Sequence, residues 1–307
     1  MLNHLLPPPW PFLLDEFAAF ESAVVGLAAP TVGNHGTYLR AYGWWWLANR
    51  PGAHPFTSTA TDVAAFLTAE AERGLVARTR RSQAAALRAF FDWLQLRGDI
   101  DRNPAAQLPS VKVPPTTPEI YHRDEVAAIL AHTAELTDLR GRQRHAIVAT
   151  LRYTGIRSGE CRTMRHADLD LAAARVRVTG KGSRTRDVLL PAPLVEILHD
   201  HLTEVRPQLP DSPLVFVNAH PFVTTPRSGF GQEALAREVE LAGLGAGVPG
   251  RHYPHRWRHT YATELARAGT DIHVVQRLMG HTSILATVGY THLAVDDLRP
   301  AIDAVWG

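Results

Sequence analysis

Two histidines, an arginine and a tyrosine occur close together in the last quarter of this 307-residue chain. His255 and Arg258 lie in a stretch whose apolar spacing is typical of a helix, and His281 and Tyr290 follow it. Arginine presents a planar fork of donors that matches phosphate oxygens, histidine can transfer a proton, and the phenol of tyrosine can form a covalent intermediate. This combination predicts attack on a phosphodiester.

Two further candidates lie upstream. Arg157 lies in a tight turn between two predicted helices, where Gly155 suits a helix end and Ser158 can cap a following helix that runs to Leu169. Lys181 lies between two glycines, in a chain in which only two of the 32 basic residues are lysines. An ammonium can release a proton whereas a guanidinium hardly can, so Lys181 is a candidate proton donor. A solvated turn lysine is the alternative.

The amino-terminal part of the chain has the pattern of a small helical domain. Apolar residues recur at helical intervals from Phe12 to about Gly98, which predicts three or four amphipathic helices. The rings of Trp44, Trp45 and Trp46 cannot all face inward, because consecutive helical residues point about 100° apart. We expect one or two of them in the core and the third at an interface.

A proline-rich stretch separates this part from the rest of the chain. Proline removes backbone donors and blocks helices, so residues 109–120 are predicted to form an extended linker. Beyond it, residues 175–179 and 184–190 alternate between apolar and polar types around a glycine-bearing turn, which predicts a β-hairpin. A short strand is predicted at 214–217, and helices are predicted at 123–130, 142–153, 191–206 and 232–241.

The composition is that of an ordinary globular protein. Hydrophobic residues make up 45% of the chain, and the net charge of +2 is too small to indicate nucleic-acid binding by itself. The single cysteine, Cys161, cannot form an internal disulfide, and no apolar run is long enough to cross a bilayer. We therefore expect a cytoplasmic protein with no membrane partner.

Several arginines gather where they could contact DNA phosphates. Such a run usually forms a solvated face, and phosphate contact is the sharper alternative. The candidates are Arg78, Arg80, Arg81 and Arg88 before and within one predicted helix, and Arg184 and Arg186 in the hairpin.

The histidines also suggest a metal site, which we reject. His255 and His259 have helical i, i+4 spacing, and His252 is close by. No glutamate stands between them as a general base, and the cations Arg256 and Arg258 would repel a metal ion. The sequence therefore predicts no metal and no cofactor.

Five segments, taken in order, resemble the signature of the tyrosine recombinase (phage integrase) family and are similar to its Xer-like members. The resemblance implies a mainly α fold with a small β-sheet (α+β), arranged as a two-domain, C-shaped clamp. A helical, SAM-like core-binding domain would span residues 1–108, the linker 109–120, and the catalytic domain 121–307. The segments are Thr154–Glu160, Gly180–Gly182, His255–Thr260, Gly280–His281 and Tyr290.

The resemblance also implies a reaction and a role for each residue. The enzyme would be a site-specific recombinase that cuts and rejoins duplex DNA through a 3′-phosphotyrosyl intermediate on Tyr290 and a Holliday junction. Arg157 and Arg258 would clamp the phosphate oxygens, and Lys181 would protonate the leaving 5′-oxygen. The remaining roles are proton removal from tyrosine by His255, a hydrogen bond to phosphate from His281, and support of the site by Glu160.

The partners follow from the same resemblance. They would be double-stranded DNA at a specific recombination site and three further copies of the chain, in a tetramer that exchanges C-terminal tails. The family also works with accessory DNA-bending or directionality proteins, and the enzyme would act at the nucleoid. Two alternatives stay open: relaxation of DNA by a type IB topoisomerase-like reaction, and a catalytically idle DNA-binding partner in a mixed recombinase tetramer.

Overall fold

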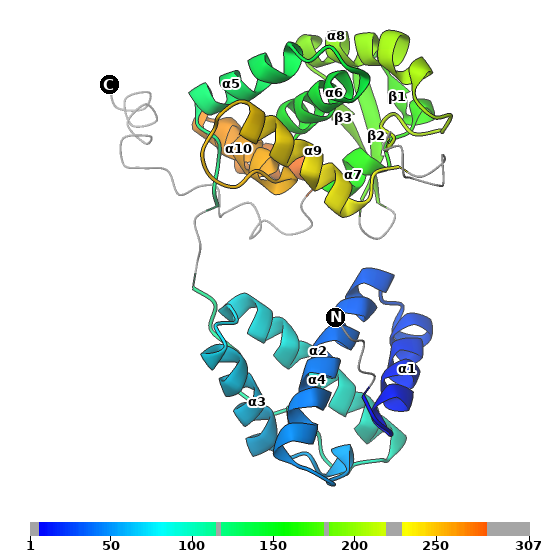
Figure 1. Ribbon diagram of the computed structural model, residues 1–307, viewed down its shortest axis with the longest axis vertical. Helices are drawn as coiled ribbons and strands as arrows, with labels where there is room; N and C mark the ends of the chain where they lie inside the picture. Colours follow the sequence, from blue (N-terminus) through cyan, green and yellow to red (C-terminus); the bar gives the residue numbers. More distant parts are fainter. Residues whose placement is uncertain (1–5, 115–117, 181–183, 219–228, 281–307) are drawn as a thin grey trace. The chain divides into compact units, whose positions relative to one another are not determined.

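The chain divides into two compact units, residues 1–116 and 117–307. A computed structural model describes residues 6–114, 118–180, 184–218 and 229–280 of it (Figure 1). Within these ranges the protein is mainly helical, with one small antiparallel sheet, which confirms the predicted fold class. Each unit has its own hydrophobic core.

The first unit is a helical domain built on aromatic side chains. Trp46 is buried in its core, Trp45 is partly buried against that core, and Trp44 is 42% exposed. The expected division of the three rings is confirmed for the core, whereas the interface role of the third stays a prediction. The elements are α1 (Trp10–Phe20), the π-helix η1 (Glu21–Val25), α2 (Ala29–Asn49), the 3₁₀-helix η2 (Pro55–Thr57), α3 (Ala60–Glu72) and α4 (Ala77–Arg97).

The second unit is organised around one buried helix. Helix α6 packs against α5, α8, α9 and α10, and its run from Ala146 to Leu151 is buried throughout. A helix that is buried on every side fixes the geometry of the elements around it, and α6 leads directly into the turn that carries Arg157. The helices of this unit are α5 (Arg123–Ala134), α6 (Leu139–Thr154), α7 (Ser158–Arg162), α8 (Ala192–Asp200), α9 (Gln232–Gly245), α10 (Pro254–Arg267) and α11 (Ile272–Met279). Short π or 3₁₀ segments are η3 (His166–Asp168), η5 (His201–Val205) and η6 (Arg206–Gln208).

The predicted hairpin is present. Strands β2 (Arg175–Thr179) and β3 (Thr185–Leu189) pair antiparallel, from Arg175 opposite Leu189 to Thr179 opposite Thr185. The side chains of Val176, Val178 and Val188 are buried while their neighbours are more exposed, as the alternation predicted. A third strand, β1 (Leu169–Asp170), pairs with β2 and was not predicted.

Two local predictions were wrong. The helix after Arg157 ends at Arg162 instead of Leu169, and its N-cap is Arg157 and not Ser158. The apolar run at 214–217 forms only an isolated bridge, between Leu214 and Arg165, because its side chains enter the core without a neighbouring strand to pair with. A short apolar run has no period that distinguishes a strand from another buried segment.

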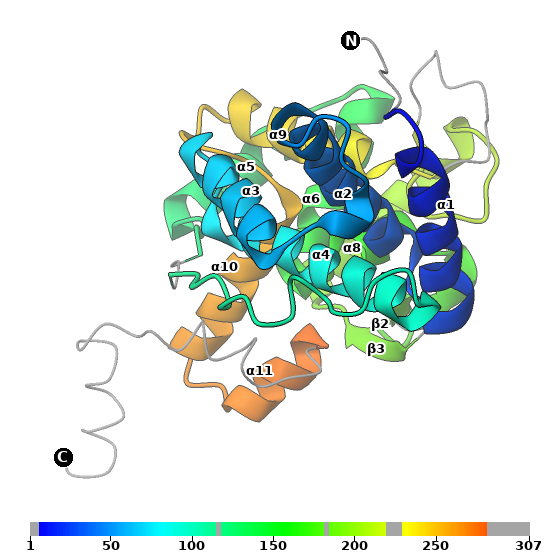
Figure 2. The same cartoon turned by 90° about the horizontal axis from the view of Figure 1, so that it is seen from below.

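Helices α10 and α11 lie next to each other, as Figure 2 shows from below. The last residue of the described chain, Gly280, caps α11 in the left-handed conformation with φ of 60°. The fold therefore brings the end of α6, the hairpin, α10 and the end of α11 close together.

Candidate active site

The turn after α6 requires glycine at residue 155. Gly155 has φ of 59°, and a Cβ on it would overlap the ring of Tyr261 on α10. This close approach lets the Gly155 carbonyl accept a hydrogen bond from Arg258 Nη1 at 2.6 Å. The turn that presents Arg157 is thereby joined directly to the helix that carries Arg258.

Arg157 is the N-cap residue of α7, and Glu160 holds it in place. The backbone N–H of Arg157 donates to Glu160 Oε2 at 2.8 Å, and its Nη1 donates to Oε1 at 3.0 Å. Its Nη2 donates to the carbonyl of Gly280 at 2.9 Å. The guanidinium is therefore positioned from both ends, while a third of the side chain stays exposed.

Glu160 is a buried carboxylate with two guanidinium partners. Arg186 on β3 donates from Nη1 to Oε1 at 2.7 Å and from Nη2 to Oε2 at 2.9 Å, and the Glu160 side chain is only 2% exposed. Burial by itself would raise the pKa of this carboxyl, but hydrogen bonds from Arg186 and Arg157 and their charges lower that pKa to about 2. Glu160 therefore stays ionised and fixes the two arginines.

Arg258 connects the turn after α6 to the end of α11. The residue is 3% exposed, and besides Gly155 it donates to the carbonyl of Met279. Arg157 binds the next carbonyl, that of Gly280, and a Cβ on Gly280 would come within 2.9 Å of Arg186 Cζ. Guanidinium groups from three different elements thus converge on the two residues that precede His281.

His255 and His259 lie one turn apart on α10, with ring centroids 6.2 Å apart. Burial, followed by the charges of Arg258 and Arg157, lowers the pKa of His255. Burial, His255 and Arg258 lower the pKa of His259 to about 4. Both imidazoles are therefore neutral at pH 7, and a neutral imidazole can accept a proton.

The structure brings together four of the predicted active-site residues, Arg157, Glu160, His255 and Arg258. Lys181, His281 and Tyr290 lie outside the described residues. Their described neighbours reach the same cluster: a Cβ on Gly180 would lie 3.1 Å from Glu160 Oε1, and Gly280 binds Arg157.

The predicted DNA-contacting arginines divide into two groups. Arg78, Arg81 and Arg184 are exposed, and Arg80 is half-buried with Nε bonded to the Leu75 carbonyl at 3.1 Å, so for these four phosphate contact stays a prediction. The other two have hydrogen-bond partners inside the protein, and for them too phosphate contact stays untested. Arg88 donates to the carbonyls of Ala105 and Leu108 at 3.1 and 2.8 Å, and Arg186 is engaged by Glu160.

Sequence reasoning missed two arginines that act inside the second unit. Arg186 was interpreted by its charge alone, although its position on a strand of alternating burial was a signal that one face of the hairpin turns inward. Arg256 was considered only as a cation that repels metal ions; it is 7% exposed and contacts residues before α5. Consecutive helical residues point about 100° apart, so the neighbours of Arg256 contain no local sign of an inward-facing guanidinium.

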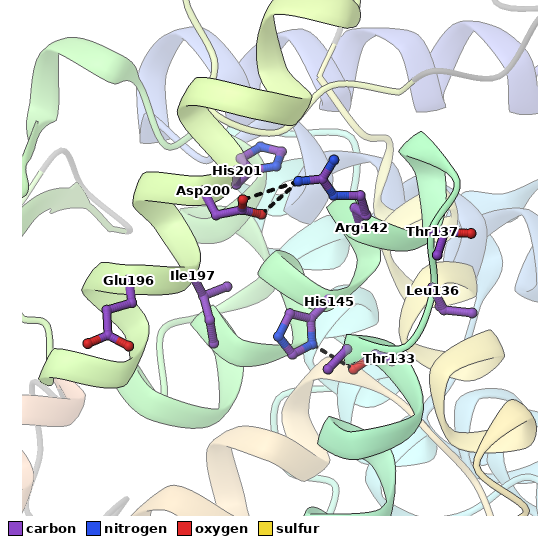
Figure 3. A pocket seen from close by; sticks show the side chains of 10 residues that line it. Thr133, Leu136, Thr137, Arg142, His145, Glu196, Ile197, Asp200 and His201 are labelled. Carbon is purple, nitrogen blue, oxygen red and sulfur yellow. Dashed lines mark hydrogen bonds and ion pairs between the residues drawn. The ribbon is translucent and has the colours of Figure 1, made fainter.

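A separate pocket of about 500 Å³ lies between the end of α5, the start of α6 and α8. Figure 3 shows Arg142 pointing toward Asp200 and His145 toward Thr133. Arg142 Nη2 donates to the two Asp200 oxygens at 3.2 and 3.0 Å, and His145 Nδ1 and the Thr133 hydroxyl are 2.9 Å apart. None of the described candidate residues lines it.

Neither a metal-binding cluster nor a membrane-spanning helix occurs among the residues that the structure describes. Across residues 6–114, 118–180, 184–218 and 229–280, no group of three or more histidine, cysteine, aspartate or glutamate side chains could hold a metal ion. Over the same ranges, no helix has the length and apolar character needed to cross a membrane.

Comparison with known proteins places the chain in a family. The model of the phage integrase family matches residues 120–296. Tyrosine recombinase XerC of Oceanobacillus iheyensis is 32% identical over 254 residues, which cover 81% of each chain.

Two solved structures share the fold. The XerH site-specific recombinase bound to its difH substrate has a TM-score of 0.73 at 20% identity, covering 100% of this chain and 99% of the other. A lambda integrase tetramer bound to a Holliday junction has a TM-score of 0.68 at 17% identity, covering 91% of this chain and 76% of the other. Neither the topoisomerase alternative nor the idle-partner alternative finds support in these matches. The chain therefore belongs to the phage integrase family and is a tyrosine-type site-specific recombinase.

Proposed function

We propose that this chain cuts and rejoins duplex DNA at a specific site with Tyr290 as nucleophile. The phenolic oxygen of Tyr290 forms a bond to the scissile phosphorus while the bond from phosphorus to the 5′-oxygen breaks. The product is a 3′-phosphotyrosyl enzyme and a free 5′-hydroxyl. The ester keeps the energy of the broken bond, so rejoining requires no nucleotide. Arginines take the role that a metal ion has in other phosphoryl-transfer sites.

One observation supports this assignment above the others: Arg157 and Arg258 converge on the consecutive carbonyls of Met279 and Gly280. Guanidinium donors that point at one place suit the non-bridging oxygens of a phosphorane, which carry extra negative charge in the transition state. Charge that is already oriented in a water-poor site stabilises such a state with little reorganisation. We infer that the scissile phosphate accepts hydrogen bonds from N–H groups of these two arginines.

Two further residues transfer protons, and a third binds the phosphate. A phenol has an ordinary pKa near 10, so Tyr290 must lose its proton as it attacks. His255, whose pKa is lowered, is a neutral acceptor for that proton. Lys181 protonates the leaving 5′-oxygen, and His281 donates a hydrogen bond to the phosphate.

The partners proposed for the reaction are DNA and copies of this chain. Four protomers on two sites would exchange strands through a Holliday junction, and the tail after Tyr290 would pack on a neighbouring subunit. The lambda integrase tetramer bound to a Holliday junction supports this arrangement by its shared fold. Arg78, Arg80, Arg81 and Arg184 would contact DNA phosphates.

The domains would follow the divisions 1–108, 109–120 and 121–307. The enzyme would act at the nucleoid in the cytoplasm, with accessory proteins setting the direction of recombination.

Covalent trapping tests the proposal. DNA that remains attached to the protein in its native host after denaturation is sequenced, which identifies the cleavage site. The wild type should yield one enriched sequence, and Tyr290→Phe should yield no adduct. Adducts that survive this substitution would show that another residue is the nucleophile, and absence of adducts from the wild type would contradict the proposed reaction.

A leaving-group substitution tests Lys181 separately. Lys181→Ala should cleave normal DNA slowly and should regain speed on DNA with sulfur in place of the bridging 5′-oxygen, because a thiolate leaves without protonation. Arg184→Ala, in the same hairpin, should gain nothing from the sulfur. A Lys181 variant that stays equally slow on both substrates would move this residue to a binding role.

A further inference from the structure

Arg256 lies between the active-site residues of α10 but points to a different part of the unit. Its Nη2 donates to the carbonyl of Ile120 at 3.1 Å and to Glu125 Oε2 at 3.2 Å. Its Nη1 donates to the carbonyl of Arg251 at 3.1 Å. One guanidinium therefore joins the segment that precedes α5, the first turn of α5 and the loop that leads into α10.

Tyr121 is the second part of this contact. Its ring lies under the Arg256 guanidinium, with 3.9 Å from Cζ to the ring centroid, and 4.4 Å from the ring of the fully buried Trp257. Its hydroxyl and His252 Nδ1 are 3.1 Å apart, and His252 Nε2 lies 3.0 Å from the Val248 carbonyl. If Nε2 carries the proton for that carbonyl, Nδ1 accepts the hydrogen bond from Tyr121.

The backbone is fixed at the same place. The N–H of Tyr121 donates to Thr260 Oγ1 at 2.8 Å, and this hydroxyl donates to the Arg256 carbonyl at 2.8 Å. Arg256, Trp257 and Thr260 thus form one face of α10 and bind the chain around residue 121. We call this set of Tyr121, Glu125, Arg256 and Thr260 the clip.

The other face of α10 carries the chemistry. Arg258 contacts the carbonyls of Gly155 and Met279, and burial together with the charges of Arg258 and Arg157 lowers the pKa of His255. A helix is a rigid body over one turn, so a rotation or shift that follows loss of the clip would move His255 and Arg258 together. A displacement of about 1 Å at a catalytic group can lower a rate on the order of 100-fold.

We propose that Arg256 is a positioning residue for strand cleavage. It holds α10 against the chain around Tyr121 and so keeps the catalytic residues of α10 in place. The proposal rests on the proposed function, because it assigns the clip an effect on the reaction of Tyr290. Arg256 is 7% exposed, and its guanidinium donates to the Ile120 and Arg251 carbonyls and to Glu125, away from the cluster of Arg157 and Arg258. The clip therefore acts on the cleavage rate and leaves DNA affinity nearly unchanged.

Arg206 provides a matched control. It is also 7% exposed, and it donates to two backbone carbonyls, Leu214 at 3.0 Å and Ser212 at 2.8 Å. Arg206 lies on η6, both acceptors lie in the segment that follows it, and neither belongs to α10. Arg206→Gln and Arg256→Gln thus remove comparable buried guanidinium groups from the same unit.

The experiment measures single-turnover cleavage by the full chain at saturating DNA. The substrate is a nicked duplex that carries the sequence recovered from covalent trapping, and the folded fraction of each variant is measured by circular dichroism at the assay temperature. Arg256→Gln should cleave at least about 10-fold more slowly per folded molecule than Arg206→Gln, with a DNA dissociation constant within about threefold of the wild type. Arg256→Lys, which keeps the charge for Glu125 but cannot reach all the acceptors, should recover part of the rate.

The opposite results would overturn the clip. If Arg256→Gln cleaves as fast per folded molecule as Arg206→Gln, or if only DNA affinity falls, Arg256 has a purely structural or binding role. If Arg256→Gln does not fold, Thr260→Val is measured in its place. This change removes the acceptor for the Tyr121 N–H and keeps the shape of the side chain. An unchanged cleavage rate for Thr260→Val would also overturn the clip. A wild-type protein that forms no adduct contradicts the proposed function instead.

Discussion

Arg186 places its two terminal nitrogens on the two carboxylate oxygens of Glu160, at 2.7 and 2.9 Å. Glu160 also receives the backbone N–H and the side chain of Arg157. The hairpin is therefore tied to the turn of Arg157 through a single buried carboxylate. This relationship explains why the Arg186 side chain is only 18% exposed although it lies on a hairpin rich in exposed charge.

Removal of Arg186 should destabilise the protein strongly. Arg186→Gln leaves a buried carboxylate with one guanidinium partner instead of two, and breaking a buried ion pair costs about 3 kcal/mol or more. Arg177→Gln is the control, since its ion pair with Asp187 lies on the same hairpin with side chains 60% and 43% exposed. Exposed pairs contribute roughly 1 kcal/mol at most. Urea unfolding measures the free energy of unfolding of both variants. Equal losses would show that the Glu160–Arg186 pair contributes no more than an exposed pair.

Glu160 should make the protein sensitive to acid. Its pKa is about 2 in the folded protein against an ordinary 4.5, so the unfolded chain binds a proton in a pH range where the folded protein does not. The resulting stability, about 3 kcal/mol, is present above pH 4.5 and is lost as the pH falls toward 2. Glu160→Gln should flatten the dependence of unfolding free energy on pH in this range, and Asp187→Asn should not. A wild-type profile as flat as that of Glu160→Gln would contradict the low pKa.

The pairing of Glu160 with Arg186 shows where sequence reasoning ends. The capping relation between Arg157 and Glu160 is local, because a carboxylate three residues after an N-cap reaches back to it, and such spacing is visible in the chain. The partner on β3 lies 26 residues further along the chain and is brought near by the tertiary fold, which no local pattern contains. The sequence therefore suggested the same role for Arg184 and Arg186, although Arg184 is exposed and Arg186 is bonded to Glu160.

The spacing of apolar residues predicts a strand only when one face of the strand is buried and the other is exposed. Val176 and Val178 alternate with exposed arginines, so their period of two predicted the strand and its inward face. Val215, Phe216 and Val217 are all fully buried, and a run without alternation carries no information on backbone pairing. The clip was missed for a related reason: Tyr121 directly follows the predicted linker, and its contacts with α10 join residues far apart in sequence.

Gly155 should not tolerate alanine. The substitution places a methyl group in the Tyr261 ring and forces φ of 59° on a residue with a side chain, which together should cost at least about 2 kcal/mol. It should also slow cleavage, because the Gly155 carbonyl positions Arg258. Gly159→Ala is the control, since a Cβ there meets nothing within 4 Å. Thermal unfolding and adduct formation measure both effects, and a Gly155→Ala protein of normal stability would show that the turn can relax.

The rate of cleavage should depend on pH through His255. Burial, then the charges of Arg258 and Arg157, lower the pKa of this imidazole, so its neutral form persists below the ordinary value of 6.5. If His255 accepts the proton of Tyr290, the single-turnover rate should stay constant as the pH falls to 6.5 and decline only below it. His255→Gln should be slower throughout and should lack this decline, with circular dichroism at each pH confirming that both proteins remain folded. A decline of the wild-type rate centred at or above pH 6.5 would assign the titrating group elsewhere.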